Sequence, residues 1–217
     1  CVDINEAKVE KMRQGVIPIY EPHLDVLFER NIKAGRLTFT TDIVEGVKEA
    51  EIIFLALPTP PGEDGSADLS YILGVAEQLG KLITDYKVIV DKSTVPVGTA
   101  EKVHTVIAKN AQVDFAVVSN PEFLREGFAV SDFMKPDRVV IGTRDERARK
   151  VMESLYRPFV RQGNPIYFMD EKSAELTKYA ANSFLATKIT FMNEVANFCE
   201  LVGADVDQVR IGIGSDS

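Results

Sequence analysis

Short apolar runs alternate with longer segments of helical periodicity along this chain, and this alternation limits the architectures it can adopt. The apolar runs have the length of strands, and the segments between them repeat apolar side chains at helical spacing. Gly15 and Gly35 follow two of the helical segments, where a glycine commonly ends a helix. We predict strands at Cys1–Ile4, Leu37–Thr40, Ile52–Leu57, Lys87–Asp91, Phe115–Ser119, Arg138–Ile141 and Ile166–Phe168, and helices at Glu6–Gln14, Leu24–Ala34, Ile43–Glu49, Leu69–Thr84, Thr99–Lys109 and Glu146–Phe159.

The predicted strands are apolar along nearly their whole length instead of alternating between apolar and polar residues. Such strands are typical of a parallel sheet that is covered on both faces. Strands that alternate with helices along the chain build an α/β domain of the doubly wound type. The sequence therefore predicts an α/β fold with a Rossmann-like, doubly wound parallel sheet.

The pattern changes after Asp170. Residues Ser173–Val202 contain neither proline nor glycine and predict one long helix that ends at Gly203. Between Leu176 and Met192 its only charged residues are Lys178 and Lys188, so we expect it to be buried between domains or between subunits. We therefore divide the chain into a domain at 1–170 and the start of a central helical, dimerisation domain at 171–217.

Composition excludes several classes of function. The net charge of −8 argues against nucleic-acid or anionic-membrane binding, and no apolar run has the length of a membrane helix. The two cysteines have no metal-ligand or disulfide spacing, which favours a reducing, cytoplasmic setting without a structural metal. The chain lacks an initiator methionine and ends on a polar, glycine-containing stretch, so we expect it to continue at both ends.

Asp3 occupies the position of a ribose-binding residue. In a dinucleotide-binding fold, an acidic residue ends the second strand and accepts hydrogen bonds from the adenosine ribose. Asp3 ends the first predicted strand and Lys8 follows in the next helix, so we expect the first strand and its glycine loop to precede residue 1. A carboxylate at this position repels a 2′-phosphate, which favours NAD over NADP. A turn or cap residue remains the alternative for Asp3.

Three predicted strands lead into loops rich in proline, threonine and charged residues. These loops are Pro58–Gly65, Lys92–Thr99 and Asn120–Gly127. Ligands of open α/β sheets bind beyond the carboxyl ends of the strands, where these loops would meet. One such loop is most simply a turn with a helix cap, but three in succession predict a ligand site.

Lys178 and Asn182 are four residues apart and therefore share one face of the long predicted helix. A buried lysine on an apolar helix is costly unless it is paired, and its charge is suited to stabilising a developing oxyanion. A lysine that extends to solvent is an equally good interpretation of the pattern alone.

Six segments carry a resemblance to a known family: Ile17–Pro22, Thr59–Asp68, Ser93–Thr99, Asn120–Gly127, Asp132–Arg138 and Gly212–Ser217. They resemble the UDP-glucose/GDP-mannose dehydrogenase family, in its order and over essentially the whole chain. The resemblance implies oxidation of a sugar C6 alcohol to the uronate, through an aldehyde and a cysteine thioester, with two NAD reduced. UDP-glucose is the expected substrate, and GDP-mannose and UDP-N-acetylmannosamine are alternatives.

The resemblance also implies roles for individual residues. Asp3 and Lys8 bind the adenosine side of NAD, and Thr59, Pro60, Ser93, Thr94 and Glu126 complete the cofactor-binding set. The catalytic set is Thr94, Glu122, Lys178 and Asn182, and the substrate-binding set is Glu122, Phe123, Leu124, Arg125, Glu126, Lys178 and Asn182. Glu122 is the expected acid/base, and the resemblance implies a homodimer. The family's cysteine lies beyond Ser217 and Cys199 does not match it, so we expect residues 1–217 alone to be inactive.

Three other functions compete with this interpretation. A short-chain epimerase needs a tyrosine four residues before a lysine, and none of the six tyrosines has one. A hydroxyacid dehydrogenase of the 6-phosphogluconate kind shares the fold and an inward Lys–Asn pair, and needs no cysteine. A non-catalytic nucleotide-binding or regulatory module is the third, and formation of NADH would exclude it.

Overall fold

The computed structural model describes residues 1–215 and divides the chain into two compact units, Cys1–Leu176 and the residues from Thr177 onward. Asp216 and Ser217, which end the last matched segment, lie outside the described residues. The strands are β1 (Ile52–Leu55), β2 (Lys87–Asp91), β3 (Phe115–Ser119), β4 (Val139–Gly142) and β5 (Ile166–Met169). The helices are α1 (Glu6–Arg13), α2 (Leu24–Lys33), α3 (Ile43–Lys48), α4 (Ser70–Leu82), α5 (Thr99–Ala108), α6 (Ala129–Met134), α7 (Glu146–Tyr156), η1 (Arg157–Phe159), α8 (Glu171–Val202) and α9 (Val206–Gly214).

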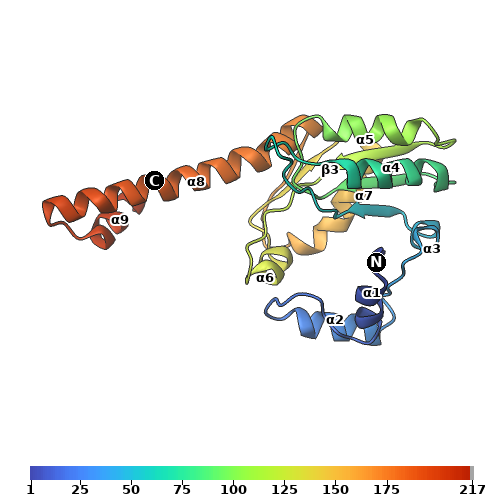
Figure 1. Cartoon of the computed structure of the whole chain (residues 1–217), viewed down its shortest axis with the longest axis horizontal. Helices are drawn as coiled ribbons and strands as arrows, with labels where there is room; N and C mark the ends of the chain where they lie inside the picture. Colours follow the sequence, from blue (N-terminus) through green and yellow to red (C-terminus); the bar gives the residue numbers. More distant parts are fainter. Residues whose placement is uncertain (216–217) are drawn as a thin grey trace. The chain divides into compact units, whose positions relative to one another are not determined.

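The first unit is built on a five-stranded sheet in the order β1-β2-β3-β4-β5 (Figure 1). Three of the four neighbouring pairs are parallel, which confirms the predicted α/β class. The prediction of a wholly parallel sheet was wrong at one pair, because β4 runs antiparallel to β3 through Ser119 and Gly142. Two parallel strands need a crossover that carries the chain back to the end of the sheet where the first strand began. The connection between β3 and β4 instead stays at the end where β3 finishes, and it contains only the short α6.

Alternate residues of the central strands enter two separate cores. Ile89 and Val117 pack with α4 and α5, whereas Val88, Val90 and Val118 pack on the opposite face with α7 (Figure 1). The period of two places successive side chains on opposite faces of the sheet. This explains why β2 is buried at every residue, as the apolar residues at its centre predicted.

The contact between α4 and α5 requires a glycine. A Cβ atom at Gly80 would lie 2.6 Å from the carbonyl oxygen of Ile107, which is too close for any side chain. The close approach lets the two helices cover one face of the sheet together.

The first forty residues form an N-terminal lobe of the first unit around Val9, Met12, Phe28 and Phe39. The rings of Phe28 and Phe39 stack with their centroids 5.4 Å apart. The predicted strands Cys1–Ile4 and Leu37–Thr40 were wrong as regular strands, because they meet only at a single parallel bridge between Val2 and Thr40. Neither segment is paired with the five-stranded sheet, so the bridge does not extend into a ladder.

The second unit consists of the remainder of α8 and the whole of α9. Gly203 adopts a left-handed φ of 73° directly after α8, as the sequence predicted for the end of this helix. Asp205 then caps α9 by accepting a hydrogen bond from the backbone N–H of Asp207 at 2.9 Å. The sequence did not predict α9, because its two glycines weaken the helical pattern. Within residues 1–215, no helix combines the length and the hydropathy that crossing a membrane requires.

Candidate functional site

The loops that follow β1 and β2 are joined by the side chain of Ser93. Its hydroxyl accepts a hydrogen bond from the N–H of Leu57 at 3.0 Å and donates one to the carbonyl oxygen of Leu57 at 2.7 Å. The hydroxyl of Thr59 extends the junction by donating to the carbonyl oxygen of Thr94 at 3.0 Å. The structure therefore brings together Thr59, Ser93 and Thr94 at the carboxyl edge of the sheet, where the sequence placed a ligand site.

Pro60 lies at the base of a small hairpin that leaves this junction. Its carbonyl oxygen accepts a hydrogen bond from the N–H of Asp68 at 2.9 Å, and Pro61 bridges to Ala67. The hairpin ends immediately before α4 begins at Ser70. These contacts fix the loop after β1 to the start of the next helix.

The loop after β3 begins at a buried asparagine. Asn120 is 1% exposed, donates to the carbonyl oxygen of Val140 at 2.7 Å and accepts from the hydroxyl of Tyr156 at 2.5 Å. Its own N–H donates to the carbonyl oxygen of Asp91 at 2.9 Å. Asn120 thus links the ends of β2 and β3 to β4 and α7. Sequence reasoning did not single out Asn120 beyond its place in the loop.

The segment Glu122–Glu126, which the sequence assigned to substrate binding, is held by its neighbours in the loop. The guanidinium of Arg125 forms two hydrogen bonds to the carboxylate of Asp132, at 3.0 and 2.7 Å, and the N–H of Arg125 adds a third at 3.0 Å. Arg138 lies 4.1 Å from the ring centroid of Phe123. Glu122 accepts a hydrogen bond from the backbone of Leu124, and Glu126 is exposed.

The pairing of Arg125 with Asp132 also shifts the ionisation of both groups. The Arg125 guanidinium lowers the pKa of the Asp132 carboxyl, and Asp132 raises the pKa of Arg125. Both partners therefore remain charged at neutral pH, and the bidentate geometry fixes their orientation.

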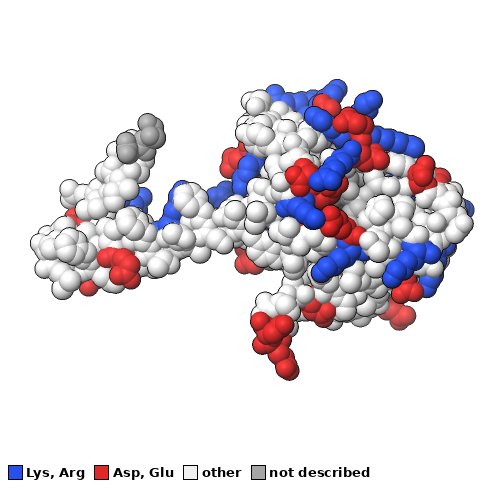
Figure 2. Space-filling model, turned by 90° about the horizontal axis from the view of Figure 1, so that it is seen from above, with Lys and Arg blue, Asp and Glu red and all other residues white. Residues whose placement is uncertain are grey.

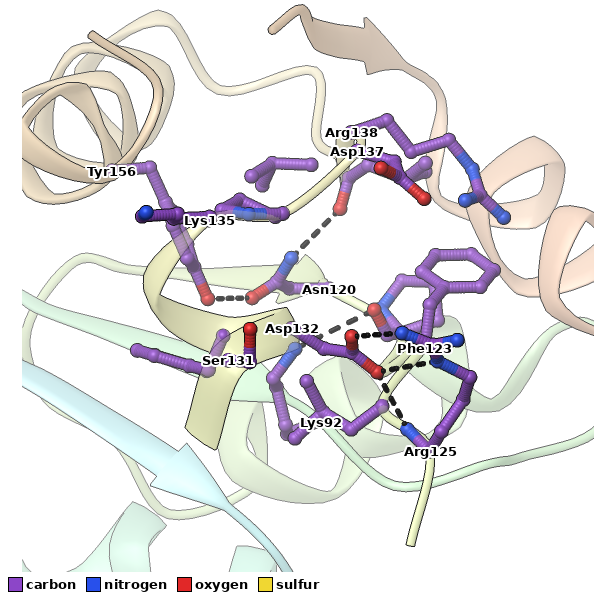
Figure 3. Close-up of a pocket in the computed structure, with 16 residues that line it drawn as sticks. Lys92, Asn120, Phe123, Arg125, Ser131, Asp132, Lys135, Asp137, Arg138 and Tyr156 are labelled. Carbon is purple, nitrogen blue, oxygen red and sulfur yellow. Dashed lines mark hydrogen bonds and ion pairs between the residues drawn. The ribbon is translucent and has the colours of Figure 1, made fainter. Parts of the chain in front are cut away.

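A polar cavity of about 400 Å³ lies beside this loop. Lys92, Asn120, Arg125, Asp132, Arg138 and Tyr156 are among its lining residues (Figure 3). Figure 3 shows Arg125 and Asp132 pointing toward each other, with Asn120 bonded to Tyr156 on another wall. Phe123 and Leu124 also line this space, so the cavity contains three of the predicted substrate residues.

Asp3 and Lys8, the predicted adenosine-side residues, lie together in the N-terminal lobe. The Lys8 ammonium is 2.5 Å from the Asp3 carboxylate, which also accepts from the N–H of Asn5 at 3.0 Å. These two hydrogen bonds, with that of Lys8 the larger cause, lower the pKa of Asp3. The carboxylate side chain is 26% exposed, so an ionised acceptor is available at the surface of the lobe.

Asp91 is a buried carboxylate that sequence reasoning treated only as a strand end. It is 1% exposed, and neither carboxylate oxygen has a hydrogen-bond partner within residues 1–215. The pKa of Asp91 is raised to about 7, with burial as the largest cause. The charge of Glu175 contributes to this rise, and the nearby N–H of Ser93 opposes it without meeting hydrogen-bond geometry. The signal available in the sequence was an acidic residue directly after the apolar centre of a predicted strand.

Glu175 closes the start of α5. Its carboxylate accepts hydrogen bonds from the N–H groups of Gly98 at 2.5 Å and Ala100 at 2.8 Å. Burial raises the pKa of Glu175, and the two backbone donors oppose that rise. Sequence reasoning missed Glu175, because its partners lie more than seventy residues away in the chain.

Lys178 and Asn182 lie in the second unit, one turn apart on α8. Lys178 is 7% exposed, whereas Asn182 is exposed. The burial of Lys178 disfavours the alternative of a lysine extended to solvent.

Two family models match this sequence. Residues 1–160 match the NAD binding domain of the UDP-glucose/GDP-mannose dehydrogenase family, and residues 172–217 match its central domain. UDP-glucose 6-dehydrogenase of Pseudomonas aeruginosa is 49% identical over the whole chain, and UDP-glucose 6-dehydrogenase TuaD of Bacillus subtilis is 48% identical. The chain spans 49% and 47% of their lengths, which is about half of each relative.

Solved structures agree with the sequence comparisons. A UDP-glucose dehydrogenase from Pyrobaculum islandicum matches with a TM-score of 0.93 and 43% identity, covering 99% of this chain and 50% of that one. A ternary complex of GDP-mannose dehydrogenase from Pseudomonas aeruginosa also has a TM-score of 0.93, with 35% identity and the same coverage. With both family models matching in order along the sequence, the chain belongs to the UDP-glucose/GDP-mannose dehydrogenase family.

Proposed function

We propose that the protein to which this chain belongs oxidises the C6 alcohol of a nucleotide sugar to the uronate, with UDP-glucose as substrate and NAD as oxidant. The alcohol loses four electrons in total, so one molecule of uronate accounts for two molecules of NADH. GDP-mannose and UDP-N-acetylmannosamine are the alternative substrates. The relatives that support this proposal are about twice as long as the chain and are named for the oxidation of UDP-glucose.

The observation that carries the proposal is the loop after β3. It places two carboxylates, Glu122 and Glu126, in the segment that borders the polar cavity. The same sheet edge carries Thr94 at the end of the neighbouring strand. An alcohol oxidation needs a proton acceptor beside the hydroxyl oxygen and a hydride-accepting cofactor beside the carbon that carries it. This edge of the sheet supplies residues for both.

The residues of the N-terminal lobe and the loop junction fit a dinucleotide. The ionised carboxylate of Asp3 suits the vicinal hydroxyls of a ribose and repels a 2′-phosphate, with Lys8 beside it. Thr59, Pro60, Ser93 and Thr94 form the junction along which the cofactor would lie. When bound, NAD supplies the acceptor for hydride.

Lys178 and Asn182 are proposed to act on the C6 oxygen. A buried ammonium is best used where negative charge develops, which here is the oxygen that loses its proton. Asn182 adds a neutral donor one turn away on the same helix. Glu122 accepts the proton, directly or through a water molecule, and Phe123, Leu124, Arg125 and Glu126 hold the sugar nucleotide.

The surface of α8 supports a homodimer. Phe184, Leu185, Ile189 and Phe191 are each more than half exposed in the single chain. The face of the second unit seen in Figure 2 is largely without charged residues. A helix that is apolar on several sides is stable in water only when a partner covers it, and a second copy provides such a cover.

We place the enzyme in the cytoplasm. Cys1 is a free, exposed thiol and Cys199 a free, buried one, which suits a reducing compartment.

We place the domain boundary near Asp170. The change from the sheet to α8 supports this boundary, with residues 1–170 binding the cofactor and residues 171–217 beginning the central domain.

Formation of NADH by the full-length protein tests the proposed activity. Purified protein is supplied with NAD and, separately, with UDP-glucose, GDP-mannose or UDP-N-acetylmannosamine, and absorbance at 340 nm is followed. We expect UDP-glucose to give the highest kcat/KM and two NADH for each uronate. NADH formation with none of the three would refute the proposal, and a single NADH per sugar would replace it with a simple alcohol oxidation.

A further inference from the structure

The loop after β3 is anchored to a distant part of the first unit by Glu21. One carboxylate oxygen of Glu21 accepts a hydrogen bond from the N–H of Gly127 at 2.9 Å, and the other accepts from the N–H of Ala129 at 3.3 Å. The residues joined are 106 and 108 positions apart in the sequence. Figure 1 shows α6 next to the segment that leads into α2. Glu21 therefore bridges the N-terminal lobe and the loop that carries Glu122 and Glu126.

The backbone at Gly127 depends on an external acceptor. Gly127 has a left-handed φ of 79°, a conformation that favours glycine. The cap position of α6, Phe128, offers no side-chain hydrogen bond to the first turn of the helix. Glu21 supplies from outside the loop the acceptors that the local sequence lacks. A carboxylate bound to backbone N–H groups makes stronger hydrogen bonds than a neutral acceptor would.

Glu21 is itself held in a rigid setting. The N–H of Leu24 donates to the carbonyl oxygen of Glu21 at 3.1 Å, which closes a tight turn over Pro22 and His23. His23 adopts a φ of 69°, and no other non-glycine residue among 1–215 has a positive φ. Proline in the second position and a positive φ in the third define a type II turn. Directly after this turn, α2 packs through Phe28 into the core of the lobe.

The two ends of this bridge belong to different parts of the proposed site. The N-terminal lobe carries Asp3 and Lys8, which are proposed to bind the adenosine side of NAD. The anchored loop carries the carboxylates proposed to act at the sugar. Asp132, which lies on α6, binds Arg125 of the same loop. Glu21 binds the first turn of α6 and therefore also supports the helix that carries Asp132. Loss of Glu21 would therefore loosen both the loop and its local clamp.

We propose that Glu21 is a positioning residue that fixes the loop Asn120–Phe128 against the N-terminal lobe and so sets the placement of Glu122 and Glu126 for the sugar nucleotide. The effect on turnover rests on the proposed function, whereas the effect on the loop does not. Glu21 acts through backbone N–H groups and takes no part in the chemistry.

The test compares Glu21→Ala, Glu21→Gln and the control Glu29→Ala in the full-length protein. Glu29 lies on α2 in the same lobe, and its exposed carboxylate pairs with Lys33 at 2.5 Å. Hydrogen–deuterium exchange is measured over peptides that cover residues 120–130 and, for comparison, β2. Steady-state kinetics then give kcat and KM for UDP-glucose, and the NAD dissociation constant is measured without sugar.

We expect Glu21→Ala to raise deuterium uptake in residues 120–130 and to leave β2 unchanged. It should lower kcat/KM for UDP-glucose about tenfold or more, because two charge-assisted hydrogen bonds are lost. Glu21→Gln keeps one acceptor oxygen and should fall between wild type and Glu21→Ala. Glu29→Ala should behave as wild type in deuterium uptake, in the kinetics with UDP-glucose and in its NAD dissociation constant.

Unchanged exchange in residues 120–130 of Glu21→Ala would overturn the proposal. A general increase in exchange that includes β2 would also overturn it, since that would make Glu21 a stabilising residue without a selective effect on the loop. If wild-type protein oxidises no nucleotide sugar, the proposed function fails, and the exchange measurement still decides whether Glu21 holds the loop.

Discussion

Replacing Asp91 with asparagine should stabilise the protein, and the gain should grow with pH. Asp91 is 1% exposed at the end of β2 and neither carboxylate oxygen has a hydrogen-bond partner in the described part of the chain. Burial raises its pKa from 3.8 to about 7. The folded state therefore keeps the proton between these two values, while the unfolded state releases it. Wild-type stability is lost progressively as the pH rises through this window.

The size of the effect follows from the two pKa values. Above pH 7 both states are ionised, and the shift of about 3 pKa units costs the folded state about 4 kcal/mol. At pH 5 the folded carboxyl is still neutral, and the same linkage gives a cost of about 2 kcal/mol. The asparagine side chain of the variant does not titrate, so the stability gained by Asp91→Asn should be about 2 to 3 kcal/mol larger at pH 8 than at pH 5.

Urea unfolding of wild type and Asp91→Asn at pH 5, 6, 7 and 8 measures this difference. Asp114→Asn is the matched control, because Asp114 is an exposed carboxylate of the same unit whose charge water solvates. Its effect on the free energy of unfolding should vary much less between pH 5 and pH 8. If the effect of Asp91→Asn is equal at all four pH values, a partner such as a bound cation neutralises Asp91 and the reasoning is refuted.

Three further results are expected in the full-length protein. Asp3→Ala should raise the KM for NAD about tenfold and reduce the preference for NAD over NADP, since the proposed charge-assisted hydrogen bonds to the ribose would be lost; an unchanged preference would contradict the proposed role of Asp3. Lys178→Ala should lower kcat about 10²- to 10³-fold with little change in the KM for UDP-glucose, whereas a change in KM alone would make Lys178 a binding residue. Phe191→Asp should dissociate the proposed homodimer in analytical ultracentrifugation, and a folded dimer of unaltered affinity would count against the proposed α8 interface.

The central strands were predictable because a strand buried on both faces is apolar along most of its length. The observed bounds of β2 and β3 equal the predicted ones. The segments Cys1–Ile4 and Leu37–Thr40 have similar composition but form only one bridge. Apolar composition reports burial, whereas a regular strand also needs a paired neighbour over several residues. The sequence contains no local signal for that pairing.

The sequence pattern could not predict the direction of β4 for a related reason. The apolar run Val139–Ile141 is equally compatible with a parallel or an antiparallel neighbour. The short α6, which decides the path of the chain, begins after Phe128 without a side-chain cap. Its first turn is completed by Glu21, which no local pattern connects to it.

At the candidate site, the sequence predicted which loops come together but not the buried side chains that hold these loops in place. The meeting of Thr59 with Thr94 followed from the rule that parallel strands present their carboxyl ends at one edge. The burial of Asn120, and its bonds to Val140 and Tyr156, depended on β4 and α7 lying next to β3. Such contacts become visible only when the packing of the elements is known.

The two carboxylates that hold these loops, Glu21 and Glu175, act in the same way. Loops beyond the ends of strands expose backbone N–H groups that no ladder or helix satisfies, and the protein pairs them with carboxylates. Glu175 serves Gly98 and Ala100, and Glu21 serves Gly127 and Ala129. In each case the carboxylate comes from a distant, rigid helix or turn and the loop leads to proposed site residues. The loops can therefore keep sequences suited to ligand binding, because the acceptors that fix them lie elsewhere in the chain.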